Sequence, residues 1–324
     1  NKFIYFILVM TRISFMFLIK DKIYNEELWN IFFHNIPPDL YKIYIHYKTD
    51  VKLKYFDKYK LKNCILTEWG DRSLVDAQNL MIKEGLKDLN ITNFILLSES
   101  CIPFKNFDYI YNNLNINYSY FERKPQDLKQ LKKNVYNFLN VKEIKKSSQW
   151  CILNRKHASF LHNKEMIIKY FETNNYPDER VYITALDKFG FSNEIINTCI
   201  TYCKWEYKSP HPKEFELIKS SFLFNLIKSG CLFARKFKNC YVKNNKQIVN
   251  IQEFVPFIDI IITKDNNINN LKEINLIKDI GFDGNSKKYD DIIDKNNGNL
   301  FHSIQDIIEK EEKKYKKLYL SKDY

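Results

Sequence analysis

The chain has 324 residues, of which 45% are hydrophobic and 16% aromatic, and its formal net charge is +12 at pH 7. This length and apolar content suffice for a large buried core, which excludes a disordered chain and a small disulfide-stabilised scaffold. The charge alone would suit nucleic acid, but the lysines are dispersed and the sequence has no basic region or zinc-finger spacing, so nucleic-acid binding is not predicted.

The N-terminus is apolar but interrupted. Residues 3–10 are apolar, Thr11 and Arg12 follow, and residues 13–19 are largely apolar again. A membrane span needs about 20 unbroken apolar residues, so the sequence predicts a core strand over 13–19. Residues 1–12 are compatible with the remnant of a membrane anchor, through which the protein could associate with a membrane.

Short apolar runs then alternate with amphipathic stretches, which predicts an α/β fold with a mostly parallel sheet flanked by helices. In chain order, the expected elements are a strand over 13–19, a helix over 25–33, strands over 43–46 and 64–66, a helix beginning at Ser73, strands over 94–97 and 149–153, and helices over 156–171, 178–188 and 212–229. Beyond residue 240 the chain is richer in Asn, Asp and Lys. We therefore expect one domain over 13–240 and an appendage of uncertain order over 241–324.

Seven cysteines are present, an odd number, so at least one has no disulfide partner within the chain. Cys151 lies in an apolar run, where a thiol behaves as a small core residue. Cys199 and Cys203 are four residues apart without a second Cys or His pair nearby, so a zinc site is not predicted. The sequence indicates structural cysteines.

Pro177, Asp178 and Glu179 allow two interpretations. Proline in a first turn and acids at a helix start are ordinary helix-initiation chemistry. Alternatively, Glu179 at a helix end facing a cleft is a general base that removes a proton from an attacking hydroxyl. The residues alone leave both interpretations open.

A second candidate feature is cationic. Lys213 lies at one end of a stretch of the chain, and the neighbouring residues Arg235 and Lys236 lie at its other end. Taken singly, such a lysine is typically a solvated surface side chain. Together, the three cations could stabilise a departing diphosphate through charge-assisted hydrogen bonds.

Several segments, in the same order along the chain, resemble the core-2/I-branching glycosyltransferases, a family that includes β-1,6-N-acetylglucosaminyltransferases and peptide O-xylosyltransferases. The resembling segments cover roughly residues 13–240 and are 15–18, 28–33, 44–46, 69–77, 96–103, 148–150, 177–179 and 232–237. The resemblance implies a GT-A-like (Rossmann-like) fold, a UDP-sugar donor bound without a metal ion, and inversion at the anomeric carbon. It also implies a membrane or secretory location; otherwise the protein would be cytoplasmic.

The same resemblance implies roles for single residues. The acid that follows Pro-Asp, Glu179, is the implied base. Lys236, in a Phe-Ala-x-Lys-Phe motif with Arg235, and Lys213 upstream are the implied diphosphate ligands. The family often carries arginine where Lys213 stands, and lysine lacks the bidentate fork of arginine.

The resemblance also places the substrates. Nucleotide contacts are expected near the end of the second strand, from His46, Tyr47 and Lys48. Acceptor contacts are expected from Ser98, Glu99, Ser100, Gln149, Trp150 and Trp205. For the two tryptophans a core or wall position is the alternative, and for Glu99 it is capping of a turn. Many GT-A enzymes carry Asp-x-Asp where this chain has Ser98-Glu99-Ser100, and one carboxylate makes a poor site for a hard cation, so no metal cofactor is expected.

The sequence therefore predicts an inverting glycosyltransferase that acts on a UDP-sugar and on a hydroxyl of a glycan or glycoprotein. The alternative is a protein of the same fold that binds glycans or nucleotide sugars without transferring them.

Overall fold

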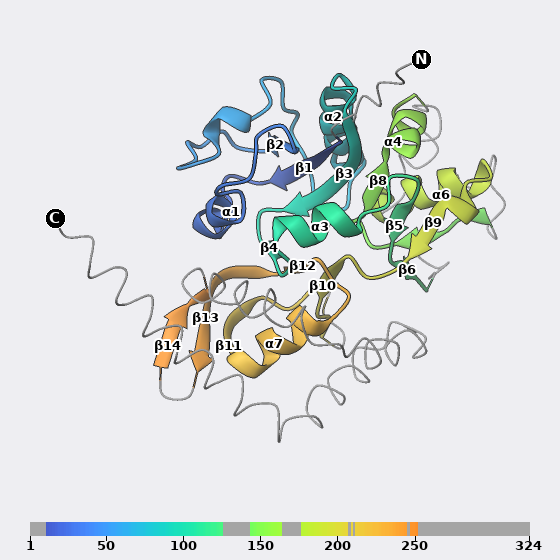
Figure 1. Ribbon diagram of the computed structural model, residues 1–324. Helices are drawn as coiled ribbons and strands as arrows, with labels where there is room; N and C mark the ends of the chain where they lie inside the picture. Colours follow the sequence, from blue (N-terminus) through green and yellow to red (C-terminus); the bar gives the residue numbers. More distant parts are fainter. Residues whose placement is uncertain are drawn as a thin grey trace, which may run out of the picture. The chain divides into compact units, whose positions relative to one another are not determined.

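The computed structural model (Figure 1) describes residues 11–125, 143–163, 176–206, 209, 211–244 and 247–251. The chain divides into two compact units: residues 1–203 with 230–238 form the first, and residues 204–229 with 239–324 form the second. The expected anchor remnant, apart from residues 11 and 12, and most of the expected appendage lie outside the described residues. Within the described ranges, no helix combines the length and apolarity needed to cross a membrane.

The first unit is built on a six-stranded sheet in the order β2–β1–β3–β8–β5–β9. At its centre β1 (Arg12–Ile19) pairs in parallel with both β2 (Tyr41–Tyr47) and β3 (Ile91–Ser98). Next to β3, β8 (Ile152–Asn154) runs antiparallel to β3 and to β5 (Ser119–Phe121), and β9 (Ile195–Asn197) is parallel to β5. The predicted α/β fold with a mostly parallel sheet is confirmed.

Helices cover both faces of this sheet because β1 buries alternate side chains on each face (Figure 1). Phe15 and Phe17 share a core with α1 (Glu26–Phe32) and α3 (Phe107–Asn113). Met16 and Leu18 share the opposite core with α2 (Ser73–Leu86), α4 (Arg155–His162) and α6 (Val181–Lys188). Two continuous cores therefore hold the central strands in place.

Smaller elements complete the described chain. In the first unit they are β4 (Ile102–Pro103), β6 (Arg123–Lys124), β7 (Lys146–Ser147), β10 (Thr201–Cys203), β12 (Phe233–Arg235), and the short helices η1 (Asp57–Tyr59), η5 (Pro177–Glu179) and η6 (Ser192–Glu194). β10, β12 and β4 form a three-stranded sheet. The second unit contains β11 (Phe215–Lys219), α7 (Ser220–Lys228), β14 (Gln247–Asn250) and most of β13 (Phe237–Asn244).

One predicted strand is wrong, one predicted helix is wrong in its first part, and residues 164–171 of the predicted helix 156–171 lie outside the described residues. Residues 64–66 form no strand, because the Ile65 amide donates to Nε2 of His46 and Cys64 Sγ accepts from an amide of β2, while Leu66 is 77% exposed. The first part of the predicted helix 212–229 is β11, whose buried Phe215 and Ile218 imitate a helical spacing. Its backbone pairs with β13, and such pairing overrides local periodicity.

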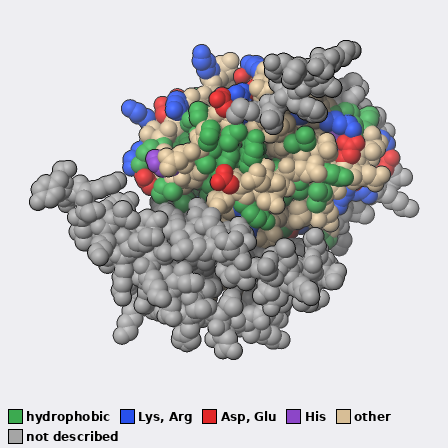
Figure 2. All heavy atoms as spheres, in the orientation of Figure 1, with side chains coloured by type: hydrophobic (Ala, Val, Ile, Leu, Met, Phe, Trp, Pro, Cys, Tyr) green, Lys and Arg blue, Asp and Glu red, His purple; other side chains and the backbone are tan. Residues whose placement is uncertain are grey.

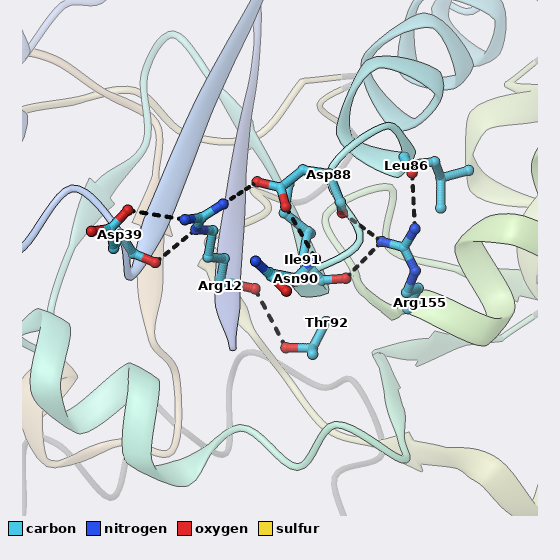
Figure 3. Close-up of polar contacts among 8 residues, drawn as sticks. All are labelled: Arg12, Asp39, Leu86, Asp88, Asn90, Ile91, Thr92 and Arg155. Carbon is cyan, nitrogen blue, oxygen red and sulfur yellow. Dashed lines mark hydrogen bonds and ion pairs between the residues drawn. The ribbon is translucent and has the colours of Figure 1, made fainter. Parts of the chain in front are cut away.

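Charged side chains fasten the amino-terminal edge of the central sheet (Figure 3). Arg12, at the start of β1, donates to Asp39 before β2 at 2.9 Å and to Asp88 before β3 at 2.7 Å. Arg155 donates to the carbonyl oxygens of Leu86 and Asp88. These contacts occupy the edge where the parallel strands begin. In open α/β sheets, ligands bind at the opposite edge, where the parallel strands end.

Candidate active site

Three chain segments meet beyond the carboxyl ends of β1 and β3. The Tyr24 amide, after β1, donates to the carbonyl oxygen of Glu99, after β3, at 2.9 Å. The side-chain amide of Asn25 donates to the Phe237 carbonyl oxygen at 2.9 Å, and the Phe237 amide donates to the Ser100 carbonyl oxygen at 2.9 Å. The segment that follows β12 is therefore fixed beside the turn that follows β3.

The turn after β3 exposes one of its three predicted acceptor residues. Ser98 and Ser100 are buried, and their hydroxyl oxygens lie 3.2 Å apart in a hydrogen bond. Glu99 is half-buried. Within this turn, Glu99 is thus the side chain that solvent or a substrate can reach.

Glu179 ends η5 and carries a half-buried carboxylate. The residue that precedes η5, Tyr176, has a left-handed backbone with φ of 56°, and its amide donates to the Gly70 carbonyl oxygen at 2.9 Å. Glu179 Oε2 forms an ion pair with Lys146 Nζ at 3.1 Å. Lys146 lies on β7 and was not predicted from the sequence, since nothing local distinguishes it from the many other lysines.

Asp178, the neighbour of Glu179, is also part of this site. Its Oδ1 is buried and has no hydrogen-bond partner among the described residues. Burial, together with the charge of Glu179, raises the pKa of this carboxyl to about 7, against the opposing charges of Arg180 and Arg235. Asp178 therefore interacts electrostatically with both Glu179 and Arg235, so η5 lies near the end of β12.

Arg235 lies over an aromatic ring. Its guanidinium carbon is 4.4 Å from the centroid of Trp150, which is 7% exposed. Trp150 thus forms a wall that holds a cation. Gln149 and Lys236 are half-buried, and Nε2 of Gln149 is buried without a hydrogen-bond partner in the described part of the chain.

The three predicted nucleotide contacts lie at the end of β2. His46 is fully buried, its Nε2 accepts from the Ile65 amide at 3.0 Å, and burial lowers its pKa to about 4. It is therefore a neutral imidazole engaged in the fold. Tyr47 is half-buried under the ammonium group of Lys60, and Lys48 forms an ion pair with Glu68 at 2.8 Å.

Lys213 and Trp205 belong to the second unit and are described by their contacts within it. Lys213 is exposed and forms an ion pair with Glu206 at 2.9 Å. Trp205 is 42% exposed and forms a β-bridge with Pro212. Both side chains are accessible on the surface of that unit.

A serine, a histidine and a glutamate form another polar cluster. Ser119 Oγ lies 2.7 Å from His157 Nδ1, and His157 Nε2 lies 3.1 Å from Glu194 Oε2. Ser119 and His157 are fully buried, so this hydroxyl cannot reach a substrate. Among the described residues, no group of three or more His, Cys, Asp or Glu side chains could hold a metal ion.

Charge is distributed without a single basic patch on the face that Figure 2 shows. There Lys and Arg side chains are scattered among Asp and Glu. On this face, the described residues form no basic stripe of the kind that tracks a nucleic-acid backbone.

The chain is similar in sequence to known proteins. The sequence model of the Core-2/I-Branching enzyme family matches residues 13–227. The chain belongs to this family. The matched range contains Glu179 and Lys213 and ends before Arg235 and Lys236.

One relative of this core-2/I-branching enzyme is a protein named glycosyltransferase BC10 from Oryza sativa subsp. japonica, which is 23% identical over 238 residues. That match covers 63% of this chain and 60% of the relative, so the chain spans less than two thirds of the relative's length. Among solved structures, galactosyltransferase LgtC with donor and acceptor sugar analogues matches at a TM-score of 0.35 and 8% identity, covering 68% of this chain and 86% of LgtC. An active-site mutant of LgtC matches at a TM-score of 0.35 and 7% identity, covering 60% of this chain and 80% of the mutant.

Proposed function

We propose that this core-2/I-branching enzyme is an inverting glycosyltransferase that moves a sugar from a UDP-sugar to a hydroxyl of a glycan or glycoprotein. Glu179 accepts the proton of the attacking hydroxyl as its oxygen bonds to the anomeric carbon. One observation carries the proposal: the Asp178 carboxyl interacts with both Glu179 and Arg235. A candidate base and a candidate cation for the leaving group are thus neighbours, although they are far apart in the sequence.

The leaving UDP carries a negative charge that must be offset. We assign this task to Arg235 and Lys236 in place of a metal ion, and Lys213, in the second unit, is proposed separately as a diphosphate ligand. The turn after β3 supplies the carboxylate of Glu99 alone, whereas a hard cation prefers several oxygen ligands. A guanidinium can bind a phosphate through two parallel hydrogen bonds. The ring of Trp150 already orients the guanidinium of Arg235.

Lys146 is the proposed positioning residue for the base. Its ammonium group holds Oε2 of Glu179 at 3.1 Å, which limits the rotation of the carboxylate. A base must lie within hydrogen-bond reach of the proton that it removes, so a fixed carboxylate reduces the cost of reaching the reactive geometry.

Substrate contacts follow the same assignment. Tyr47 and Lys48, half-buried at the end of β2, are the proposed nucleotide contacts, while His46 supports the shape of this strand end. Glu99 is the proposed acceptor ligand in the turn after β3. Trp205 offers an exposed aromatic face to which a sugar ring can bind.

The test is a UDP-release assay with a panel of UDP-sugars in EDTA. Glu179→Gln should keep its affinity for UDP and lose on the order of 10²- to 10⁴-fold in turnover, the usual contribution of a general base. The matched control is Glu143→Gln, because Glu143 also pairs with a lysine, Lys188, outside the proposed machinery. It should retain turnover.

Three other outcomes would each change the assignment. Wild-type turnover in Glu179→Gln would remove the base. Activity that appears only with Mn²⁺ would replace the cationic residues with a metal ion. Silence with every donor, together with intact UDP binding, would favour a protein that binds nucleotide sugars without transferring them.

A further inference from the structure

Two cysteines lie at the base of an excursion of the chain. The chain leaves the first unit after Cys203, at the end of β10, and returns at Gly230, before β12. One residue, Ile200, separates Cys199 from the start of β10, and one residue, Leu232, separates Cys231 from the start of β12. The segment 204–229 is therefore enclosed between these two cysteines.

The pairing of β10 and β12 places the two cysteines opposite each other. The strands are parallel, with Thr201 opposite Phe233. The pairing continues one residue further back, since the amides of Leu232 and Phe233 both donate to the Ile200 carbonyl oxygen, at 2.9 and 3.1 Å. The same register extended by two residues sets Cys199 against Cys231.

The sulfur atoms confirm this register. Cys231 Sγ lies 3.2 Å from Cys199 Sγ, in a hydrogen bond between thiols. Neighbouring strands are about 4.8 Å apart, and disulfides join residues whose Cα atoms are about 4.4–6.8 Å apart. The two side chains can therefore be bridged without moving the backbone by much.

We propose that Cys199 and Cys231 form a disulfide bond that ties together the two ends of the 204–229 excursion. The oxidant is a low-molecular-weight disulfide such as oxidised glutathione. One protein thiolate attacks it, forms a mixed disulfide and releases one glutathione. The second protein thiolate attacks the protein sulfur of that mixed disulfide and releases the second glutathione, so two protein thiols are oxidised and two glutathione thiols are formed.

The surroundings of the two thiols indicate how fast they react. The hydrogen bond with Cys231 and burial raise the pKa of the Cys199 thiol well above its usual range, so its thiolate is scarce at neutral pH. We expect a slow reaction that accelerates in mild alkali, because the thiolate is the nucleophile.

The bridge also bears on donor binding, a step that rests on the proposed function. The enclosed excursion carries Lys213, and the strand that follows Cys231 ends at Arg235. Closing the excursion reduces its conformational freedom, so less entropy is lost when Lys213 binds a diphosphate. The oxidised protein should bind UDP roughly 3- to 10-fold more tightly than the reduced protein, as expected when a loop is restrained before binding.

The experiment uses the full chain, fully reduced and then incubated with oxidised glutathione at pH 8.5. Thiols are titrated after denaturation, and the bridged peptides are identified by mass spectrometry without reduction. We expect the loss of two of the seven thiols and a peptide pair that joins Cys199 to Cys231. Cys231→Ser should lose no thiol pair, whereas the control Cys64→Ser should lose two thiols as the wild type does.

A mixed disulfide with glutathione that never converts to a disulfide within the protein, or a disulfide between other cysteines, would overturn the proposal. UDP affinity is measured by calorimetry on the reduced and oxidised proteins. Equal affinity of the two forms would overturn the link to the site and leave the bridge standing. Absence of UDP binding in both forms would instead contradict the proposed function, because the thiol titration decides the bridge without any nucleotide.

Discussion

The guanidinium of Arg235 lies over the indole ring of Trp150, 4.4 Å from the ring centroid. The ring belongs to the segment that leads into β8, and the cation lies at the end of β12, so two distant segments meet in one contact. Since the indole is itself buried, it cannot turn away, and the guanidinium is oriented before any ligand arrives. A cation oriented in advance binds an anion with less loss of side-chain entropy.

Removing that ring should weaken nucleotide binding. Trp150→Leu takes away a cation–π contact of about 1–2 kcal/mol, so the Kd for UDP should rise roughly 5- to 30-fold. Trp150→Phe keeps an aromatic face, and its Kd should stay within about 3-fold of the wild type. Isothermal titration calorimetry measures both values, at a temperature where circular dichroism shows each variant folded. Equal Kd values for the Leu and Phe variants would mean that the ring does not orient the cation.

The second prediction concerns Asp178 and the pH dependence of stability. Because its folded pKa is raised to about 7, the folded state binds more protons than the unfolded state between about pH 4 and pH 7. Its contribution to stability is therefore complete below about pH 4 and is lost progressively as pH rises to 7. Compared with the wild type, Asp178→Asn should gain about 1–3 kcal/mol of stability between pH 5 and pH 8 in urea titrations, since each pKa unit is worth about 1.4 kcal/mol.

Asp57 provides a control of opposite sign for that series. The hydrogen bond from Lys60 lowers the pKa of Asp57, so its contribution is present above its unfolded pKa and is lost as pH falls. Asp57→Asn should therefore not stabilise the protein at pH 8. If Asp178→Asn fails to gain stability between pH 5 and pH 8, the buried oxygen has a partner that neutralises its charge.

The third prediction tests the support beneath the base. Gly70 has φ of 72°, and a Cβ added there would lie 3.0 Å from the ring of Tyr176. Gly70→Ala should displace Tyr176 and with it Glu179, and a misplaced base costs roughly 10- to 100-fold in kcat. UDP affinity should remain within about 3-fold, because the cations are untouched. Steady-state kinetics and calorimetry separate the two effects.

Gly190→Ala is the matched control. Gly190 also has a positive φ, of 86°, but an added Cβ would meet nothing within 4 Å. Both alanine variants bear a similar left-handed backbone cost of about 1–2 kcal/mol, so a comparable loss of stability is expected in both. A fall in kcat for both variants, or for neither, would show that the contact between Gly70 and Tyr176 does not position the base.

The sequence was informative where one local signal decides the structure. The apolar runs of β1 and β3 predict buried strands because a central parallel strand must be apolar on both faces. The helix-initiating residues predicted a helix from residue 178, and in the structure Glu179 ends the short helix η5, two residues before α6 begins. In these places the local pattern and the tertiary environment agree.

The remainder depends on contacts between distant segments. Lys146 carries no signal of its own, and its partnership with Glu179 exists because β7 is brought beside η5 by the fold. The raised pKa of Asp178 follows from burial, which periodicity does not report. The resemblance implied that His46 contacts the nucleotide; in the structure its Nε2 accepts a hydrogen bond from the Ile65 amide, a contact between side chain and backbone that no strand pattern contains.

The last prediction separates stability from activity at the opposite edge of the sheet (Figure 3). Burial acts to raise the pKa of Asp88, but the hydrogen bonds from Arg12 and from the Asn90 amide, together with the charge of Arg12, outweigh burial and lower that pKa. Arg12→Met leaves Asp39 and Asp88 without their shared cation, so the free energy of unfolding should fall by about 1–3 kcal/mol at pH 7.

The loss in Arg12→Met should diminish as pH falls below about 4, because the stabilisation from a lowered carboxyl pKa is lost as pH falls through it. Urea titrations at pH 7 and pH 3.5 measure the change, and kcat should match the wild type. The control is Lys87→Met, which removes an exposed pair with Glu84 and should cost no more than about 0.5 kcal/mol. Equal losses in the two variants would mean that Arg12 contributes no more than an ordinary surface pair to holding β1, β2 and β3 together.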